Sequence, residues 1–105
     1  MPQVGLLVRL EAKPEKIEEL AAFLKGALPA ANNEPGTSSW FALRFGPTAF
    51  GIYDSFPDET AREKHLSGPI AAALMAKAPE LLARPPSIEQ VDVLAAKLPH
   101  APAVK

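Results

Sequence analysis

Hydrophobic residues recur at every second position in residues 4–11, 37–45, 48–56 and 88–96. This period is typical of β-strands, whose side chains point alternately to the two faces of a sheet. In the first segment all of the even-numbered positions are apolar, which favours a sheet with one face packed on a core. The sequence therefore predicts four strands.

Segments with a helical period lie between these strands. Residues 14–28 begin with a proline and three glutamates, which suit the first turn of a helix, and carry leucine and alanine along one stripe. This helix is expected to stop before Pro29. After the third strand, Asp58 is suited to cap a short helix, and a second short helix begins at Pro69 and is expected to break at Pro79.

The register of the hairpin formed by the second and third strands decides which side chains share a face. If Phe45 pairs near Thr48, Trp40 lies opposite Tyr53 on one face of the sheet. The face toward the helices then carries a set of apolar side chains and one carboxylate. The set is Phe41, Leu43, Phe45, Phe50, Ile52 and Phe56, and the carboxylate is Asp54.

The order strand, helix, strand, strand, helices, strand is typical of a ferredoxin-like βαββαβ fold of the α+β class. In that fold an antiparallel sheet carries its helices on one face. A length of 105 residues suits one domain, which we assign to residues 1–98. The remaining residues, 99–105, are rich in proline and alanine and are expected to form a flexible C-terminal tail.

The second face of this sheet is also apolar, because it is expected to carry Leu7, Trp40, Tyr53 and Val91 beside small residues. An exposed apolar patch of that kind usually marks a partner surface. Two copies packed sheet to sheet would bury both patches, so the sequence predicts a homodimer that closes into a dimeric α+β barrel.

Composition narrows the chemistry further. The chain has no cysteine, which excludes disulfides, thiolate metal sites and a cysteine nucleophile. Eleven basic and twelve acidic residues leave no basic patch for nucleic acid. No apolar run approaches the roughly 20 residues of a membrane span, and no basic-then-apolar N-terminal segment is visible. We therefore expect a cytoplasmic protein that binds neither nucleic acid nor membrane.

Metal ions and organic cofactors are not expected either. The two histidines, His65 and His100, lie 35 positions apart and do not make a ligand set. No glycine-rich phosphate loop precedes a helix, which argues against a nucleotide cofactor.

Three short motifs follow one another along the chain. They are Glu34-Pro35-Gly36-Thr37 before the second strand, Asp54-Ser55-Phe56 at the end of the third, and Glu59-Thr60-Ala61 with His65 and Ser67 in the next helix. In this order and spacing they resemble the antibiotic biosynthesis monooxygenase domain of the dimeric α+β barrel superfamily. The resemblance covers about the first 96 residues.

Proteins of that family oxidise polycyclic phenols to quinones with molecular oxygen and without metal, flavin or haem; others oxidise quinols or degrade haem. The resemblance implies a cofactor-independent monooxygenase acting on an aromatic or quinol-type small molecule. The haem-degrading branch typically has an asparagine on the first strand and a tryptophan in the helix after the third. This sequence has no asparagine on that strand and has His65 at the tryptophan position, so haem degradation is not expected.

His65 and Asp54 are the candidate catalytic residues. An imidazole titrates near neutral pH, so His65 is suited to take a proton from a phenol. Asp54 is costly on an apolar face unless it is paired, and pairing with His65 would orient the ring. Alternatively, His65 only packs, and Asp54 binds backbone amides at the start of the next helix. His65→Ala is expected to change stability little, because alanine is a good helix former.

The substrate pocket is expected between the sheet and the helices, with a small apolar aromatic ligand inside. Its expected walls are Phe23, Leu43, Phe50, Ile52, Phe56, Leu66, Ile70 and Leu74. Trp40, Tyr53 and Arg44 are interpreted as dimer-packing residues, the alternative being an aromatic wall with a cation for an oxyanion. Glu34 is expected to be a turn or interface residue. A non-catalytic ligand-binding or structural dimer and an acid–base isomerase or cyclase remain alternative functions.

Overall fold

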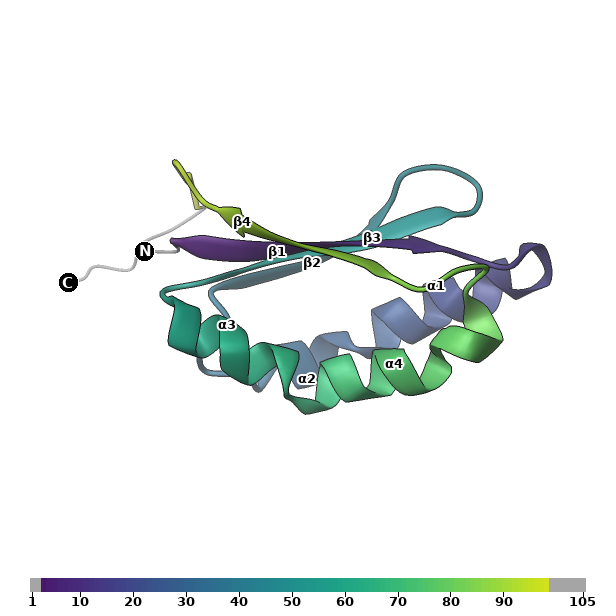
Figure 1. Ribbon diagram of the computed structural model, residues 1–105, viewed down its shortest axis with the longest axis horizontal. Coiled ribbons are helices and arrows are strands. Elements are labelled where there is room, and N and C mark those ends of the chain that lie inside the picture. Colours follow the sequence, from purple (N-terminus) through teal and green to yellow (C-terminus); the bar gives the residue numbers. More distant parts are fainter. Residues whose placement is uncertain (1–2, 99–105) are drawn as a thin grey trace.

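Four strands form one antiparallel sheet in the computed structural model, which describes residues 3–98 (Figure 1). The strands are β1 (Val4–Glu11), β2 (Ser39–Arg44), β3 (Ala49–Phe56) and β4 (Ser87–Asp92). The helices are α1 (Ile17–Gly26), α2 (Leu28–Asn32), α3 (Glu59–Leu66) and α4 (Pro69–Leu81), with a 3-10 turn at Pro14–Lys16 before α1. The sheet order β2-β3-β1-β4 confirms the predicted ferredoxin-like α+β fold.

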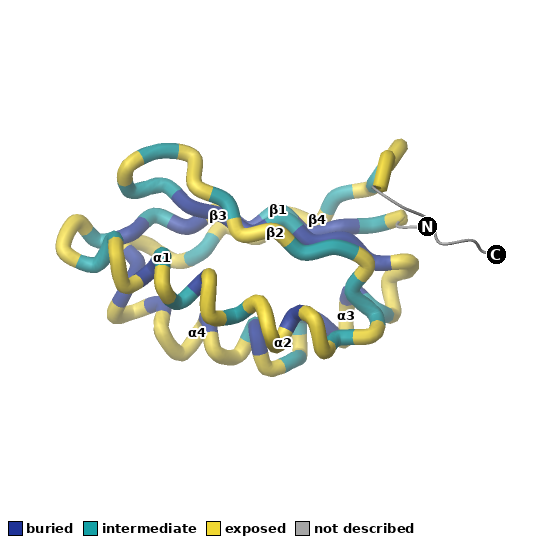
Figure 2. Tube along the Cα trace, turned by 180° about the vertical axis from the view of Figure 1, so that it is seen from behind, coloured by how far each residue is buried: buried dark blue, intermediate teal, exposed yellow. Residues whose placement is uncertain are grey.

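All of these helices lie on one side of the sheet, and no helix within residues 3–98 covers the other side (Figure 1). On the helix side, Leu6, Val8 and Leu10 of β1 are buried, as the alternation of residues 4–11 predicts. They pack with Leu20 of α1 and Leu74 of α4 in the core. Figure 2 shows that, within the sheet, the buried residues lie on the two central strands, β1 and β3.

The predicted register of the β2–β3 hairpin is wrong by one residue. Trp40 lies opposite Asp54, not Tyr53, and Phe41 lies opposite Tyr53. The cause is the loop, since the amide of Phe45 donates to the carbonyl of Ala49 at 2.7 Å. Phe45 therefore lies opposite Ala49 with three residues, 46–48, between them, where the predicted pairing with Thr48 leaves two. The extra residue moves each side chain of β2 to the other face.

This correction exchanges the two faces of β2. Trp40 turns toward the helices and packs against the core, whereas Phe41 and Phe45 lie on the outer face, each 51% exposed. The ring of Phe45 folds over Gly51, where a Cβ on any other residue would lie 2.8 Å from the ring. A Cβ there would also lie 2.7 Å from the carbonyl oxygen of Val8 on β1, so Gly51 permits this close approach of backbone and ring.

One of the two expected proline stops is confirmed and the other is wrong. α1 ends at Gly26, before Pro29, as predicted, whereas α4 continues past Pro79, where a break is expected. Pro29 lies in the first turn of α2, where its missing amide hydrogen costs nothing. Pro79 lies inside the last turns of α4, and Lys13 Nζ donates to its carbonyl at 2.8 Å. Burial of Ala78 and Leu81 on either side keeps α4 helical, since one buried leucine offsets much of the roughly 3 kcal/mol that proline costs.

The end of the chain is shorter in regular structure than its pattern indicates. β4 stops at Asp92, although the pattern predicts an extended segment over residues 88–96. The predicted flexible tail, 99–105, lies outside the described residues, so that prediction stays a prediction. Among residues 3–98, no helix is long and apolar enough to cross a bilayer.

Candidate active site

A short helix directly after β3 carries His65. Only Pro57 and Asp58 separate Phe56 from the first residue of α3. Asp58 caps this helix as predicted, because its Oδ1 accepts from the amide of Ala61 at 2.9 Å. The cap fixes where α3 begins, and His65 then falls in the last turn of the helix, facing back toward β3.

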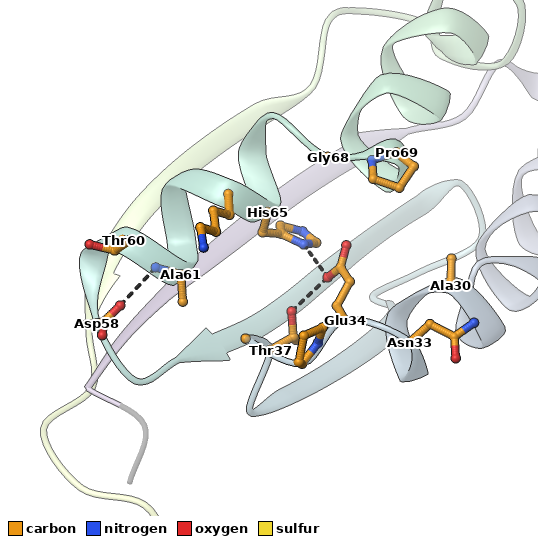
Figure 3. Close-up of a pocket in the computed structure, with 13 residues that line it drawn as sticks. Ala30, Asn33, Glu34, Thr37, Asp58, Thr60, Ala61, His65, Gly68 and Pro69 are labelled. Carbon is orange, nitrogen blue, oxygen red and sulfur yellow. Dashed lines mark hydrogen bonds and ion pairs between the residues drawn. The ribbon is translucent and has the colours of Figure 1, made fainter.

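The imidazole of His65 is held between two carboxylates. Its Nε2 lies 2.9 Å from Asp54 Oδ2 of β3, and its Nδ1 lies 2.7 Å from Glu34 Oε1 (Figure 3 draws the second contact). The ring also packs against Phe56, with ring centroids 5.2 Å apart. Two parts of the chain, β3 and the loop before β2, therefore fix this side chain.

Asp54 is the most deeply buried charged group of the site, with 1% of its surface exposed. Apart from the approach of His65, neither of its carboxylate oxygens has a hydrogen-bond partner among residues 3–98. The predicted contact between Asp54 and His65 is confirmed. The alternative, in which Asp54 binds the first amides of α3, is wrong because Asp58 takes that role.

Glu34 reaches His65 from the loop between α2 and β2, where the sequence indicates only a turn or interface residue. Thr37 Oγ1 donates to the same oxygen, Glu34 Oε1, at 2.7 Å. Gly36 permits the approach of this loop to α3, since a Cβ there would lie 3.2 Å from the Cβ of Ala61. The sequence signal for this contact is the Glu34-Pro35-Gly36 motif, because its proline and glycine favour a turn.

The two carboxylates also set the charge of the ring. Burial alone would lower the pKa of His65, but the hydrogen bond and charge of Asp54 raise it, and those of Glu34 raise it further. The net effect holds the pKa of His65 above its usual value of about 6.5. Both carboxylates stabilise the imidazolium form of the ring relative to the neutral form, because each can accept a hydrogen bond from one ring nitrogen.

An open-sided cavity of about 660 Å³ begins at the Nδ1 side of His65 (Figure 3). Residues of α2, its following loop, α3 and the start of α4 line it. They are Ala30, Asn33, Glu34, Pro35, Gly36, Thr37, Asp58, Thr60, Ala61, Lys64, His65, Gly68 and Pro69. The volume is that of ordinary small-molecule sites. The sequence predicted that His65 borders a pocket, but none of the eight expected wall residues lines this cavity.

A second cavity of about 330 Å³ lies between α1–α2 and α4. It includes Phe23 and Ile70, two of the residues expected to form the substrate pocket. It also shares Ala30 and Pro69 with the first cavity, so the two adjoin each other.

The other expected wall residues lie elsewhere. Phe50, Ile52 and Leu74 pack in the closed core, and Phe56 is fully buried against His65. Leu66 is half-buried at the end of α3 and lines neither cavity. Leu43 pairs with Gly51 on the outer face, so the corrected register removes it from any pocket between sheet and helices.

The charged groups of the site do not form a metal cluster. Within residues 3–98, no three histidine, aspartate or glutamate side chains lie close enough together to hold an ion. Asp54 and Glu34 instead face opposite nitrogens of one ring. This arrangement suits proton transfer at a fixed imidazole, because Asp54 orients the ring and Nδ1 faces the cavity.

The fold of this chain occurs in other proteins of known structure. The chain is similar to the NE2512 protein of unknown function from Nitrosomonas europaea, with a TM-score of 0.93 and 58% sequence identity. The match covers 96% of this chain and 98% of that chain. The chain belongs to the same family as NE2512. This identity is high enough to relate the two proteins by descent as well as by fold.

More distant solved structures share the architecture. Rv0793 from Mycobacterium tuberculosis matches with a TM-score of 0.79 and 20% identity, over 90% of this chain and 97% of that chain. An antibiotic biosynthesis monooxygenase matches with a TM-score of 0.76 and 15% identity, over 88% and 99%. These matches support the resemblance to such domains at the level of the fold. No protein-family model matches the sequence, and no curated protein does.

Proposed function

We propose that the protein is a cofactor-independent monooxygenase that acts on an aromatic or quinol-type small molecule. The observation that carries this proposal is His65, which Asp54 fixes from inside the protein while Nδ1 faces a cavity of ligand size. The fold shared with an antibiotic biosynthesis monooxygenase supports the same reaction class. His65 is the base and Asp54 is its positioning residue.

The reaction needs a phenolate, because the deprotonated ring is the electron-rich species that reacts with molecular oxygen. Neutral His65 takes the phenol proton at Nδ1 and becomes an imidazolium that Asp54 stabilises at Nε2. For a simple phenol, one O₂ converts a ring C–H into the second carbonyl of a quinone. One oxygen atom enters the product, the other leaves as water, and the phenol is the electron donor.

Oxygen uptake tests this proposal directly. Purified protein treated with a chelator should consume oxygen when given a naphthol or a hydroxylated anthracene, chosen from a panel by thermal shift. One quinone should form for each O₂ consumed. A panel member that binds without oxygen consumption or quinone formation would favour the ligand-binding alternative. Conversion of the ligand to an isomer under nitrogen would favour the isomerase.

We also propose that the protein is a homodimer, in which the outer face of the sheet is the contact. Phe41 stacks on Tyr53 there, with ring centroids 6.4 Å apart, and Phe45 lies beside them under Arg9. Aromatic side chains this exposed form an apolar patch that a second copy would cover. Two such sheets packed together would give the dimeric α+β barrel, with at least about 1,000 Å² buried.

Sedimentation equilibrium at micromolar concentration should give twice the chain mass of 11.2 kDa. Phe41→Lys should shift the protein to monomer, because it places a charge within the proposed contact. Met75→Lys is the matched control, since Met75 is 55% exposed and lies on α4, away from this face. A wild-type mass near one chain would overturn the dimer.

A further inference from the structure

Among the described residues, Glu34 is the side chain that lies between Nδ1 of His65 and the larger cavity. Its contact with Nδ1 therefore blocks access from the cavity to that nitrogen. Asp54 occupies Nε2 from the buried side, where 1% of its surface is exposed. Glu34 occupies Nδ1 from the loop, and its side chain is 17% exposed. The carboxylate that blocks Nδ1 is therefore the more accessible of the two, and it belongs to the cavity wall.

Displacement of Glu34 would leave Nδ1 available to a ligand oxygen at the same position. A ligand hydroxyl that gives its proton to neutral His65 becomes an oxyanion on Nδ1–H, opposite Asp54 on Nε2. That state has the same charges in the same places as the imidazolium form of the ring held between Glu34 and Asp54, with one anion at each nitrogen. The bound carboxylate of Glu34 is thus a template for the oxyanion of the ligand.

The lining of the smaller, adjoining cavity indicates the polarity of the rest of the ligand. It is lined by Phe23, Ala27, Ile70 and Ala73, with Gly26 and the two residues that it shares with the larger cavity. None of these side chains is charged or polar, so the space favours an apolar group. The shared residues, Ala30 and Pro69, join the polar end at His65 to the apolar end between α1–α2 and α4.

We propose that Glu34 is an internal competitor for the ligand, and that the ligand is a phenol or enol whose acidic hydroxyl displaces Glu34 from His65 while an attached apolar chain fills the adjoining cavity. This inference rests on the proposed function for the choice of an acidic hydroxyl. It adds the position of that hydroxyl, the direction of the remaining groups and the role of Glu34 as a competitor.

Binding measured by calorimetry at neutral pH tests the inference without turnover. The probe is 4-hexylphenol, compared with 4-methylphenol, which lacks the chain, and 4-hexylanisole, which lacks the acidic hydroxyl. Wild-type protein should bind 4-hexylphenol at least tenfold more tightly than either analogue. Glu34→Gln should tighten 4-hexylphenol about tenfold, because a neutral amide of the same shape competes less well for a charged donor. Affinity for 4-hexylanisole should not change.

A second variant tests the apolar end independently of the loop. Ala73→Phe should fill the smaller cavity and weaken 4-hexylphenol about tenfold while leaving 4-methylphenol unchanged. Ala72→Phe is the matched control, because Ala72 is the exposed neighbour on α4 and lines neither cavity. It should leave both affinities at the wild-type value.

The results separate this inference from the proposed function. Unchanged or weaker 4-hexylphenol binding in Glu34→Gln, no effect of Ala73→Phe, or no saturable wild-type binding overturns the inference, even if oxygen uptake occurs with another phenol. The expected binding pattern without any oxygen uptake supports the inference as a description of the ligand site. In that case it is the monooxygenase proposal that fails.

Discussion

Replacing His65 with glutamine is expected to lower turnover by roughly 10²–10⁴-fold, which is the usual contribution of a general base. Glutamine keeps a donor that can reach Asp54 but cannot accept the substrate proton. The variant should therefore remain folded and still bind the substrate. The measurement is the initial rate of oxygen uptake at saturating substrate, with the melting temperature recorded for each protein.

The pH dependence of the same rate identifies the base. Activity should rise with pH as the imidazolium loses its proton, with a midpoint above about 6.5 because Asp54 and Glu34 raise the pKa of His65. Asp54→Asn removes one of these carboxylates, so the lower pKa of His65 should move the midpoint downward. Glu63→Gln, on the exposed side of α3, is the control and should leave the profile unchanged.

Two results would contradict the catalytic assignment. If His65→Gln keeps a rate within a few-fold of wild type, the ring only packs. If Asp54→Asn leaves the midpoint unchanged, then a different group titrates in the profile and Asp54 does not act through His65.

The fold could be predicted because its signals are local. Alternation from Val4 to Leu10, a turn at Gly46-Pro47 and the cap at Asp58 each depend on neighbours within a few residues. Element order then leaves few arrangements for an α+β domain of this size. Proline was a misleading local signal only at Pro79, which lies inside α4, where packing outweighs its cost; α1 ends before Pro29 as predicted.

The faces of β2 could not be predicted because they depend on one residue of loop length. Two-residue and three-residue loops around Gly46-Pro47 are both compatible with the sequence, and they place opposite side chains on the core. Alternation did not decide between them, because β2 is apolar on both faces. Trp40 and Phe41 are both large and apolar, so either side chain could have packed in the core with the other on the outer face. In the structure Trp40 packs against the core and Phe41 is exposed.

The site was predicted in part for a related reason. Asp54 and His65 are eleven positions apart across one short connection, so their pairing could be inferred from the order of β3 and α3. Glu34 and His65 are 31 positions apart, and their contact depends on how the loop before β2 approaches α3. The same loop forms much of the cavity wall, so the wall could not be predicted before the position of the loop was known. Several of the residues predicted for the wall lie in the closed core instead.

The burial of Asp54 changes what is expected of His65 in folding. From sequence, His65→Ala is expected to leave stability almost unchanged, and the structure contradicts the premise of that expectation. His65 is the group that approaches the carboxylate of Asp54, which is otherwise without a partner among residues 3–98. Removal of one member of a buried pair typically costs roughly 3–5 kcal/mol, because the other charge stays in a poorly solvated place.

The charged ring also makes part of this stability depend on pH. The folded-state pKa of His65 is raised above its value in an unfolded chain. Its contribution is therefore fully present below about pH 6.5 and is lost as the pH rises through the raised folded-state pKa. Wild-type protein should lose this part of its unfolding free energy between about pH 6.5 and the raised pKa, and His65→Leu should not show that loss.

A double-mutant cycle with leucine measures the pair itself. His65→Leu keeps a side chain of similar bulk but leaves Asp54 unpaired, so denaturant unfolding at about pH 6 should show a loss of roughly 3–5 kcal/mol. Asp54→Leu with His65→Leu should recover most of that loss, because an apolar pair of similar volume needs no partner charge. Glu34 keeps its bond from Thr37 in both proteins and contributes little to the difference. If the two substitutions change the free energy of unfolding additively, Asp54 and His65 are not energetically coupled. That result would contradict the assignment of Asp54 as the positioning residue.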